Sequence, residues 1–123
     1  MIKHGTGNII NIASMASLAA GRGGIAYTSA KHGLLGFTRQ ISLMHGPQGI
    51  RINAILPGPI DTAMIRRILE MPQHPVCQKI KASPAGRPGQ PEEVAKLALF
   101  LASEDSAYIH GAAFEIDGGY TIF

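Results

Sequence analysis

The residues of this chain best suited to acid–base chemistry are Tyr27 and Lys31, four positions apart in the run Tyr-Thr-Ser-Ala-Lys. On a helix this spacing places both side chains on one face. A free tyrosine has a pKa of about 10, and a nearby ammonium group lowers it by favouring the phenolate. Lowering that pKa from about 10 to about 7 corresponds to roughly 4 kcal/mol. A tyrosine tuned in this way exchanges a proton with a substrate hydroxyl or carbonyl.

Ser14 adds a third polar group to this pair. It follows residues 7–13, an apolar run predicted to be a buried strand, and it precedes Tyr27 by thirteen residues. Ligands of open α/β sheets bind at the carboxyl ends of the strands, so Ser14 is placed to hydrogen-bond a reacting oxygen. The ordinary alternatives are a turn-capping serine, a packed tyrosine and a surface lysine, and about 0.1 such Tyr–Lys pairs are expected by chance.

Apolar periodicity predicts strands alternating with helices along the whole chain. The predicted strands are residues 7–13, 51–56 and 112–116, and the predicted helices are residues 25–45, 60–71 and 91–101. Residues 14–24 are predicted to form a glycine-rich loop, and residues 72–90, with four prolines, an irregular segment. The alternation predicts an α/β fold with a parallel sheet and covering helices. Three strands correspond to one half of a doubly wound, Rossmann-like sheet.

Four ordered blocks resemble the short-chain dehydrogenase/reductase family, and most closely its 3-oxoacyl-[acyl-carrier-protein] reductase and glucose dehydrogenase subgroup. The blocks are a strand ending in Ser14, the Tyr27-to-Lys31 pentapeptide, the Arg51-to-Gly58 strand with its terminal Pro-Gly, and Pro84 to Ala95 together with the closing Asp117-Gly118-Gly119. They cover almost the whole chain. The resemblance implies that residues 1–123 are the C-terminal half of a Rossmann-fold domain of this family.

The resemblance also implies an NAD(P)-dependent oxidoreductase that moves hydride between a nicotinamide and a small-molecule carbonyl or secondary alcohol. Tyr27 is then the catalytic acid/base, Lys31 binds the nicotinamide ribose and tunes Tyr27, and Ser14 hydrogen-bonds the reacting oxygen. Residues 61–89 are implied to form the substrate lid. Full-length members are implied to be homo-oligomers, either dimers or tetramers. Besides Tyr27 and Lys31, the residues implied to bind NAD or NADP are Pro57, Gly58, Ile60 and Thr62.

The chain departs from the family pattern because the glycine-rich, pyrophosphate-binding strand-to-helix turn is absent. Residues 21–26 formally fit G-x-G-x-x-A, but they begin seven residues after Ser14, so we interpret them as a decoy. Two functions therefore stay open: an oxidoreductase or its catalytic half, and a truncated, inactive remnant acting as a binding or decoy subunit. Gly33 and Gly36 inside the long helix predict close helix packing, at a subunit interface or on the chain's own sheet.

Composition excludes several other classes of protein. The formal charge is +3 and the pI about 9.3, but the basic residues are scattered without interleaved aromatics, which disfavours nucleic-acid binding. Cys77 is the single cysteine, so no intramolecular disulfide forms. The five histidines lack metal-ligand spacing, and no apolar run is long enough to span a bilayer. The N-terminus also lacks a signal-peptide core. We expect a cytoplasmic protein with no metal and no membrane association.

Overall fold

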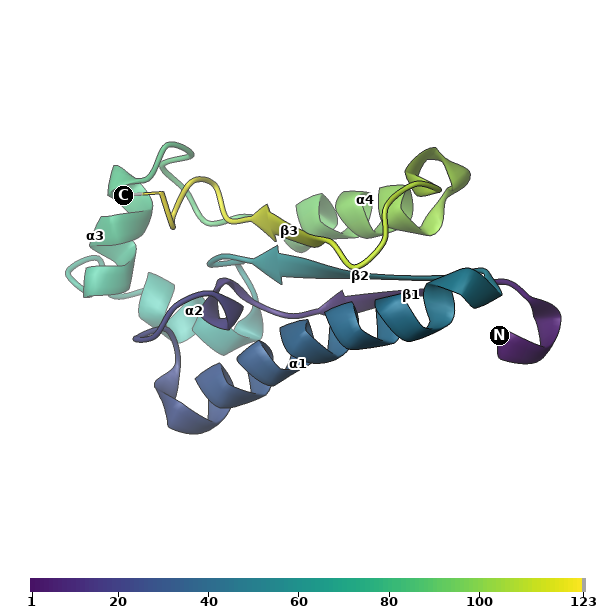
Figure 1. The fold of residues 1–123 in the computed structure, drawn as a ribbon. Helices are drawn as coiled ribbons and strands as arrows, with labels where there is room; N and C mark the ends of the chain where they lie inside the picture. The colour runs from purple at the N-terminus through teal and green to yellow at the C-terminus, as the bar shows by residue number, and fades with distance from the viewer. Residues whose placement is uncertain (123) are drawn as a thin grey trace.

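The computed structural model describes residues 1–122, which form an α/β fold built on a parallel sheet (Figure 1). Its strands are β1 (Gly7–Ile12), β2 (Ile50–Pro57) and β3 (Ala113–Ile116), in the spatial order β1-β2-β3. Gly7 to Ile12 of β1 pair with Ile50 to Ile55, and Ala54 to Pro57 of β2 pair with Ala113 to Ile116. The α/β prediction is confirmed, and β2 is the central strand among the described residues.

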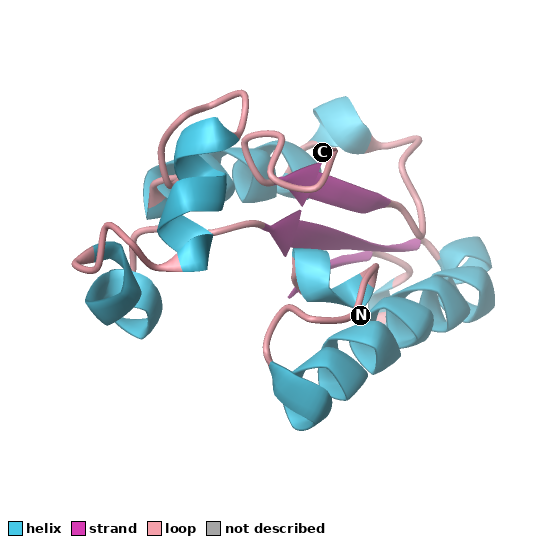
Figure 2. Cartoon of the chain, turned by 90° about the vertical axis from the view of Figure 1, so that its left-hand side faces the viewer, coloured by secondary structure: helices cyan, strands magenta, loops and turns pink. Residues whose placement is uncertain are grey.

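Helices connect the strands and lie on both sides of the sheet. They are α1 (Gly24–His45), α2 (Ala63–Leu69), α3 (Pro75–Ala82) and α4 (Pro91–Ala102). Short 3-10 turns are η1 (Ile2–His4), η2 (Met15–Ser17), η3 (Gly46–Gln48) and η4 (Glu104–Ser106). Helices α1 and α4 lie on opposite sides of the sheet, and α2 and α3 lie beyond the carboxyl ends of the strands (Figures 1 and 2).

The alternation of side chains along β2 separates the two faces of the sheet. Ala54 and Leu56 are fully buried against Leu35 of α1 and form the core of one face. On the other face, the Arg51 guanidinium donates hydrogen bonds of 2.9–3.0 Å to the carbonyls of Leu101, Ser103 and Ser106. The Leu101 and Ser103 carbonyls lie at the carboxyl end of α4, where carbonyls have no partner within the helix, and the Ser106 carbonyl belongs to the following turn η4. The central strand thereby fixes the helices on both sides.

The prediction that residues 72–90 are wholly irregular is wrong, because α3 lies within them. Pro75 occupies the first turn of α3, where its missing N–H has no intrahelical partner in any case. The His74 ring nitrogen accepts from the Val76 amide, and Cys77 and Ile80, three positions apart, bury one face. The prolines that predicted a broken segment therefore flank a helix and begin it.

Gly33 and Gly36 do not pack on the chain's own sheet. Both are exposed on α1, and a Cβ atom built at either position meets nothing within 4 Å. Of the two explanations for these glycines, the intramolecular one is therefore wrong for the described residues. A role at a subunit interface stays a prediction.

Candidate active site

The three residues predicted to be catalytic lie where β1 ends and α1 begins. Ser14 follows β1 in extended backbone, is 7% exposed, and its Oγ accepts from the Ala16 amide at 3.1 Å. Tyr27 and Lys31 occupy the first two turns of α1, and the Lys31 Nζ lies 5.7 Å from the centroid of the Tyr27 ring. The same Nζ donates to the Ile12 carbonyl at 2.9 Å. The structure thus places the Tyr–Lys pair beside the strand end that carries Ser14.

The loop before α1 holds the Tyr27 ring in place. A Cβ atom on Gly23 would lie 2.6 Å from Cδ1 of Tyr27, closer than real Cβ atoms approach other atoms. Gly23 also has φ 140°, a value that favours glycine. In the sequence, Gly23 stands out only as part of the G-x-G-x-x-A run, and no sequence signal indicates its contact with Tyr27. The 3-10 turn η2 separates β1 from this loop, so residues 21–26 do not form a tight strand-to-helix turn.

A buried hydrogen-bond chain sets the position of α1 against β1. Asn11 Nδ2 donates to Oγ1 of Thr38 at 2.9 Å, and Oγ1 of Thr38 donates to the Leu34 carbonyl at 2.8 Å. Thr38 is fully buried, so loss of either partner would leave a polar group without its hydrogen bond. These residues do no chemistry, but they link the strand of Ser14 to the helix of Tyr27. The only sequence signal for them is a polar residue at an inward-facing strand position.

The residues implied to line the nicotinamide form one connected loop at the carboxyl end of β2. The Gly58 amide donates to the Ile116 carbonyl at 3.1 Å, and a Cβ on Gly58 would lie 2.6 Å from Cβ of Asp117. Ile60 forms a β-bridge with Gly89, which extends the loop toward α4. Thr62 is the N-cap residue of α2. One short stretch of backbone, from the end of β2 to the start of α2, therefore carries Pro57, Gly58, Ile60 and Thr62.

The turn after β3 supports this loop through Asp117. Its carboxylate accepts from the amides of Gly119 and Thr121 at 2.9 and 2.8 Å, and from the Thr121 hydroxyl. Burial raises the pKa of Asp117, but the hydrogen bonds from Thr121 and Gly119 outweigh burial and leave that pKa below its ordinary value. A second carboxylate, Glu93, has its pKa lowered to about 2 by hydrogen bonds from Arg87 and from the Gln90 amide. Both carboxylates are therefore structural anions at neutral pH.

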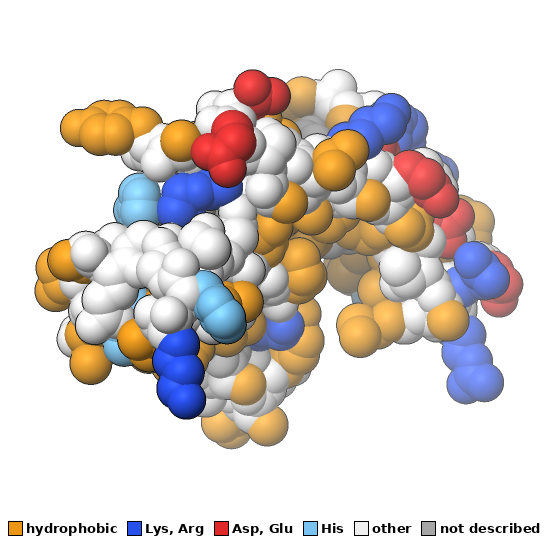
Figure 3. Space-filling view, turned by 90° about the vertical axis from the view of Figure 1, so that its right-hand side faces the viewer, with side chains coloured by type: hydrophobic (Ala, Val, Ile, Leu, Met, Phe, Trp, Pro, Cys, Tyr) orange, Lys and Arg blue, Asp and Glu red, His pale blue; other side chains and the backbone are white. Residues whose placement is uncertain are grey.

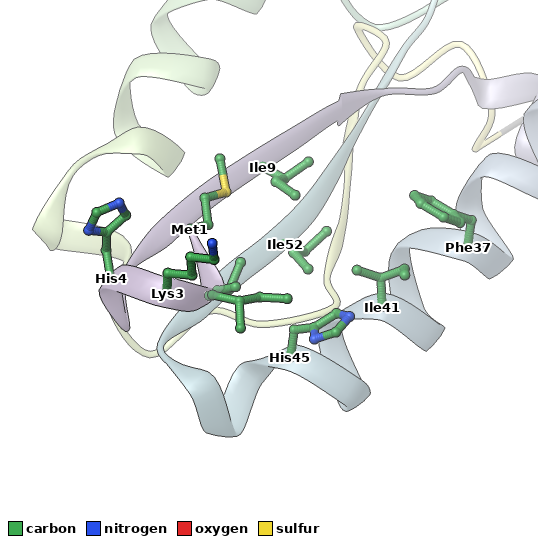
Figure 4. A pocket seen from close by; sticks show the side chains of 10 residues that line it. Met1, Lys3, His4, Ile9, Phe37, Ile41, His45 and Ile52 are labelled. Carbon is green, nitrogen blue, oxygen red and sulfur yellow. The ribbon is translucent and has the colours of Figure 1, made fainter.

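A separate apolar hollow of about 540 Å³ lies at the opposite end of α1. Ile9 and Ile52 from the strands and Phe37 and Ile41 from α1 face this space (Figure 4). On this side of the molecule, hydrophobic side chains gather around a hollowed centre (Figure 3). The hollow contains none of the residues predicted to be catalytic. Within residues 1–122, no cluster of three or more His, Cys, Asp or Glu side chains is arranged to hold a metal, and no helix is long and apolar enough to cross a membrane.

Comparison with known proteins gives one consistent family. The model of the enoyl-(acyl carrier protein) reductase family matches residues 1–121. A 3-oxoacyl-[acyl-carrier-protein] reductase from Chlamydia trachomatis is 44% identical over 119 residues, which is 97% of this chain and 47% of that protein. The chain therefore spans about half the length of the curated relatives that it matches.

Solved structures agree in fold over the entire chain. A protein from Beutenbergia cavernae, provisionally described as an NAD(P)-dependent gluconate 5-dehydrogenase, was crystallised with NADP at low occupancy. Its structure matches this chain with a TM-score of 0.93 and 36% sequence identity. The match covers 100% of this chain and 49% of the Beutenbergia chain. A 3-oxoacyl-[acyl-carrier protein] reductase from Brucella melitensis, crystallised with NAD, has a TM-score of 0.83 and 32% identity, covering 97% of this chain and 42% of its own. With its parallel Rossmann-like half-sheet and ordered motifs, this chain belongs to the short-chain dehydrogenase/reductase family, in the subgroup that resembles the 3-oxoacyl-[acyl-carrier-protein] reductases and glucose dehydrogenases.

Proposed function

We propose that the protein is an NAD(P)-dependent oxidoreductase that transfers hydride between a nicotinamide and the carbon of a carbonyl or secondary alcohol. The observation that carries this proposal is the placement of Tyr27 and Lys31 on one face of α1. Their ammonium and ring are 5.7 Å apart, and the ammonium contacts the strand end two residues before Ser14. This placement supports a site in which Tyr27 is the acid/base, Lys31 the cation and Ser14 the hydroxyl, at the carboxyl edge of a parallel sheet, where such folds bind ligands.

The site suits a nicotinamide cofactor on the β2 side. The Lys31 ammonium has three donors, and one of them contacts the Ile12 carbonyl, so two are left for ribose hydroxyls. Gly58 lets the loop backbone pack directly against Asp117, where a side chain would clash. Lys31 would hold the ribose, and Pro57, Gly58, Ile60 and Thr62 would line the nicotinamide. When bound, the nicotinamide supplies or accepts the hydride.

The chain's own residues would handle the proton and the oxygen. In the reducing direction, the Tyr27 hydroxyl donates its proton to the substrate oxygen as the carbonyl carbon becomes saturated. The Lys31 ammonium stabilises the negative charge left on Tyr27, since opposite charges this close favour the ionised form. The Ser14 hydroxyl donates a hydrogen bond to the same substrate oxygen. In the oxidising direction, Tyr27 takes the proton from the alcohol.

Two parts of the function lie beyond these residues. The family's pyrophosphate-binding turn is not among them, and the residue that selects NAD or NADP is not either. The relatives compared above are named for a 3-oxoacyl thioester and for gluconate, so membership of the family leaves the substrate open. We therefore propose the chemical class of the substrate, a carbonyl compound or a secondary alcohol.

A second function, that of a binding or decoy subunit without activity, is favoured by one observation. The apolar hollow of Figure 4 and the edge of β1 that has no strand partner among the described residues together offer a surface that another chain of this family would cover. This candidate predicts association with a homologue and no turnover of NADH or NADPH. The oxidoreductase predicts turnover that depends on Ser14, Tyr27 and Lys31.

Ser14 offers a matched test of the proposal in the intact protein, as its gene encodes it. Ser14→Ala removes a hydroxyl that would contact the substrate, whereas Ser17→Ala removes a buried hydroxyl of the same turn η2. We expect Ser14→Ala to lower kcat by about 10²-fold or more and Ser17→Ala to change it by less than about threefold. Because Ser14 also caps η2, the circular dichroism of both variants is compared with the wild type. Equal activity of the two folded variants would contradict the role of Ser14, and no turnover in the wild type would favour the binding subunit.

A further inference from the structure

Arg22 lies in the loop between β1 and α1, between residues that adjoin the two candidate catalytic side chains. Its Nη1 is 3.5 Å from Sδ of Met15, the residue directly after Ser14. The residue after Arg22 is Gly23, which packs against the Tyr27 ring. The side chain of Arg22 is therefore anchored on the residue that follows Ser14, and its backbone adjoins the glycine that packs against Tyr27.

Tyr120 fixes the direction of this side chain. The ring of Tyr120 is 6% exposed, and the guanidinium carbon of Arg22 lies 5.5 Å from its centroid. Lys79 of α3 places its Nζ 4.9 Å from the same centroid. Two positive charges from different segments therefore meet at one buried ring, whose face attracts cations. Burial raises the pKa of Tyr120, and the charge of Arg22 opposes that rise.

The Met15 and Tyr120 side chains that contact Arg22 do not neutralise its charge, because a thioether and an aromatic ring carry none. Within residues 1–122, the ion pairs join Arg66 to Asp61 and Arg87 to Glu93. No carboxylate of the described residues therefore lies within ion-pair distance of Arg22. A half-buried guanidinium without a counter-charge among the described residues attracts an anion, and its planar donor set matches a carboxylate in two parallel hydrogen bonds.

We propose, resting on the oxidoreductase function above, that the carbonyl substrate carries a carboxylate that binds the guanidinium of Arg22 while its carbonyl oxygen lies at Ser14 and Tyr27. Arg22 is then a specificity-determining residue, and Tyr120 is the residue that positions it. The substrate class is that of oxo acids and hydroxy acids.

Acetoacetate and its methyl ester test this proposal, because they share the ketone and differ in the carboxylate charge. Initial rates are measured for the intact protein with NADH and NADPH, for Arg22→Gln, and for Arg39→Gln, which removes the same charge from an exposed position of α1. We expect Arg22→Gln to lower kcat/KM for acetoacetate by at least about tenfold, equal to about 1.4 kcal/mol, chiefly through KM. The ester rate in this variant, and both rates in Arg39→Gln, should stay within about twofold of the wild type.

Tyr120 supplies the second arm of the test. Tyr120→Phe keeps an aromatic face for Arg22 and should keep the preference for acetoacetate over the ester. Tyr120→Leu removes that face and should reduce this preference by at least about threefold, corresponding to a lost contact of about 0.7 kcal/mol. Since the preference is a ratio of two substrates in one variant, partial unfolding of Tyr120→Leu does not imitate the effect.

A calorimetric titration with acetoacetate alone separates failure of this inference from failure of the proposed function. Turnover of both ketones with the same preference in wild type and Arg22→Gln would overturn the inference and leave the function standing. Absence of turnover, with acetoacetate binding that Arg22→Gln abolishes, would overturn the function and leave the carboxylate site. Absence of both turnover and binding would overturn both.

Discussion

Replacing Gly58 by alanine tests the contact that supports the nicotinamide side of the site. A Cβ atom at Gly58 would lie 2.6 Å from Cβ and 2.7 Å from Cα of Asp117. The obstacle is partly backbone, so the loop after β2 and the turn after β3 must move apart. Gly58 is not among the glycines with positive φ, and the strain therefore comes from space alone. Overpacking of this kind typically costs about 1–3 kcal/mol, and we expect the free energy of unfolding to fall by that amount.

Gly33→Ala is the matched control, because the same methyl group is added with the opposite expectation. Nothing lies within 4 Å of a Cβ at Gly33, which is in the interior of α1, so alanine should stabilise by up to about 1 kcal/mol through helix propensity. Urea unfolding followed by circular dichroism gives both values, and cofactor titration of the intact protein shows whether Gly58→Ala also weakens binding. A Gly58→Ala midpoint equal to or above the wild type would refute the account of this contact. A large loss in Gly33→Ala would indicate that this helix face is covered by another chain.

Three further predictions concern charge and assembly. Lys31→Ala should weaken cofactor binding and move the pH–rate profile to higher pH, because the ammonium 5.7 Å from the Tyr27 ring stabilises a phenolate. An unchanged profile with unchanged cofactor affinity would show that Lys31 is an ordinary surface lysine. The pKa of Asp117 is lowered on folding, so its carboxylate contributes stability that is present above its unfolded pKa of about 3.9 and is lost as the pH falls through the folded value. In urea unfolding, wild type should therefore be more stable than Asp117→Asn at neutral pH and lose this advantage in acid. An advantage that persists in acid would contradict the role given to the Asp117 carboxylate. Residues 1–123 should sediment as dimers or larger species because one edge of β1 is unpaired in the described residues, and a single cooperative 13.0 kDa species would contradict this.

The local patterns were enough to predict the strands, the long helix and the Tyr–Lys face, because each depends on residues within a few turns of one another. The prolines of residues 72–90 led to the wrong prediction of an irregular segment, because a proline is tolerated in the first turn of a helix but not in its interior. Contacts between distant segments were beyond prediction. Gly58 against Asp117, and Arg22 against Tyr120, join residues that only the folded sheet brings together. Those contacts hold the loops of the site, whereas the sequence motifs mark the residues proposed for its chemistry.

The central claim is that Tyr27 transfers the proton in a nicotinamide-dependent reaction. Tyr27→Phe in the intact protein keeps the ring that packs on Gly23 and removes only the hydroxyl. Single-turnover reduction of a ketone with NADH or NADPH is measured beside cofactor titration of the same variant. We expect a cofactor affinity within about threefold of wild type and a rate lowered by about 10²-fold or more. A variant that keeps more than about a tenth of the wild-type rate would contradict it, because the proton would then come from another group.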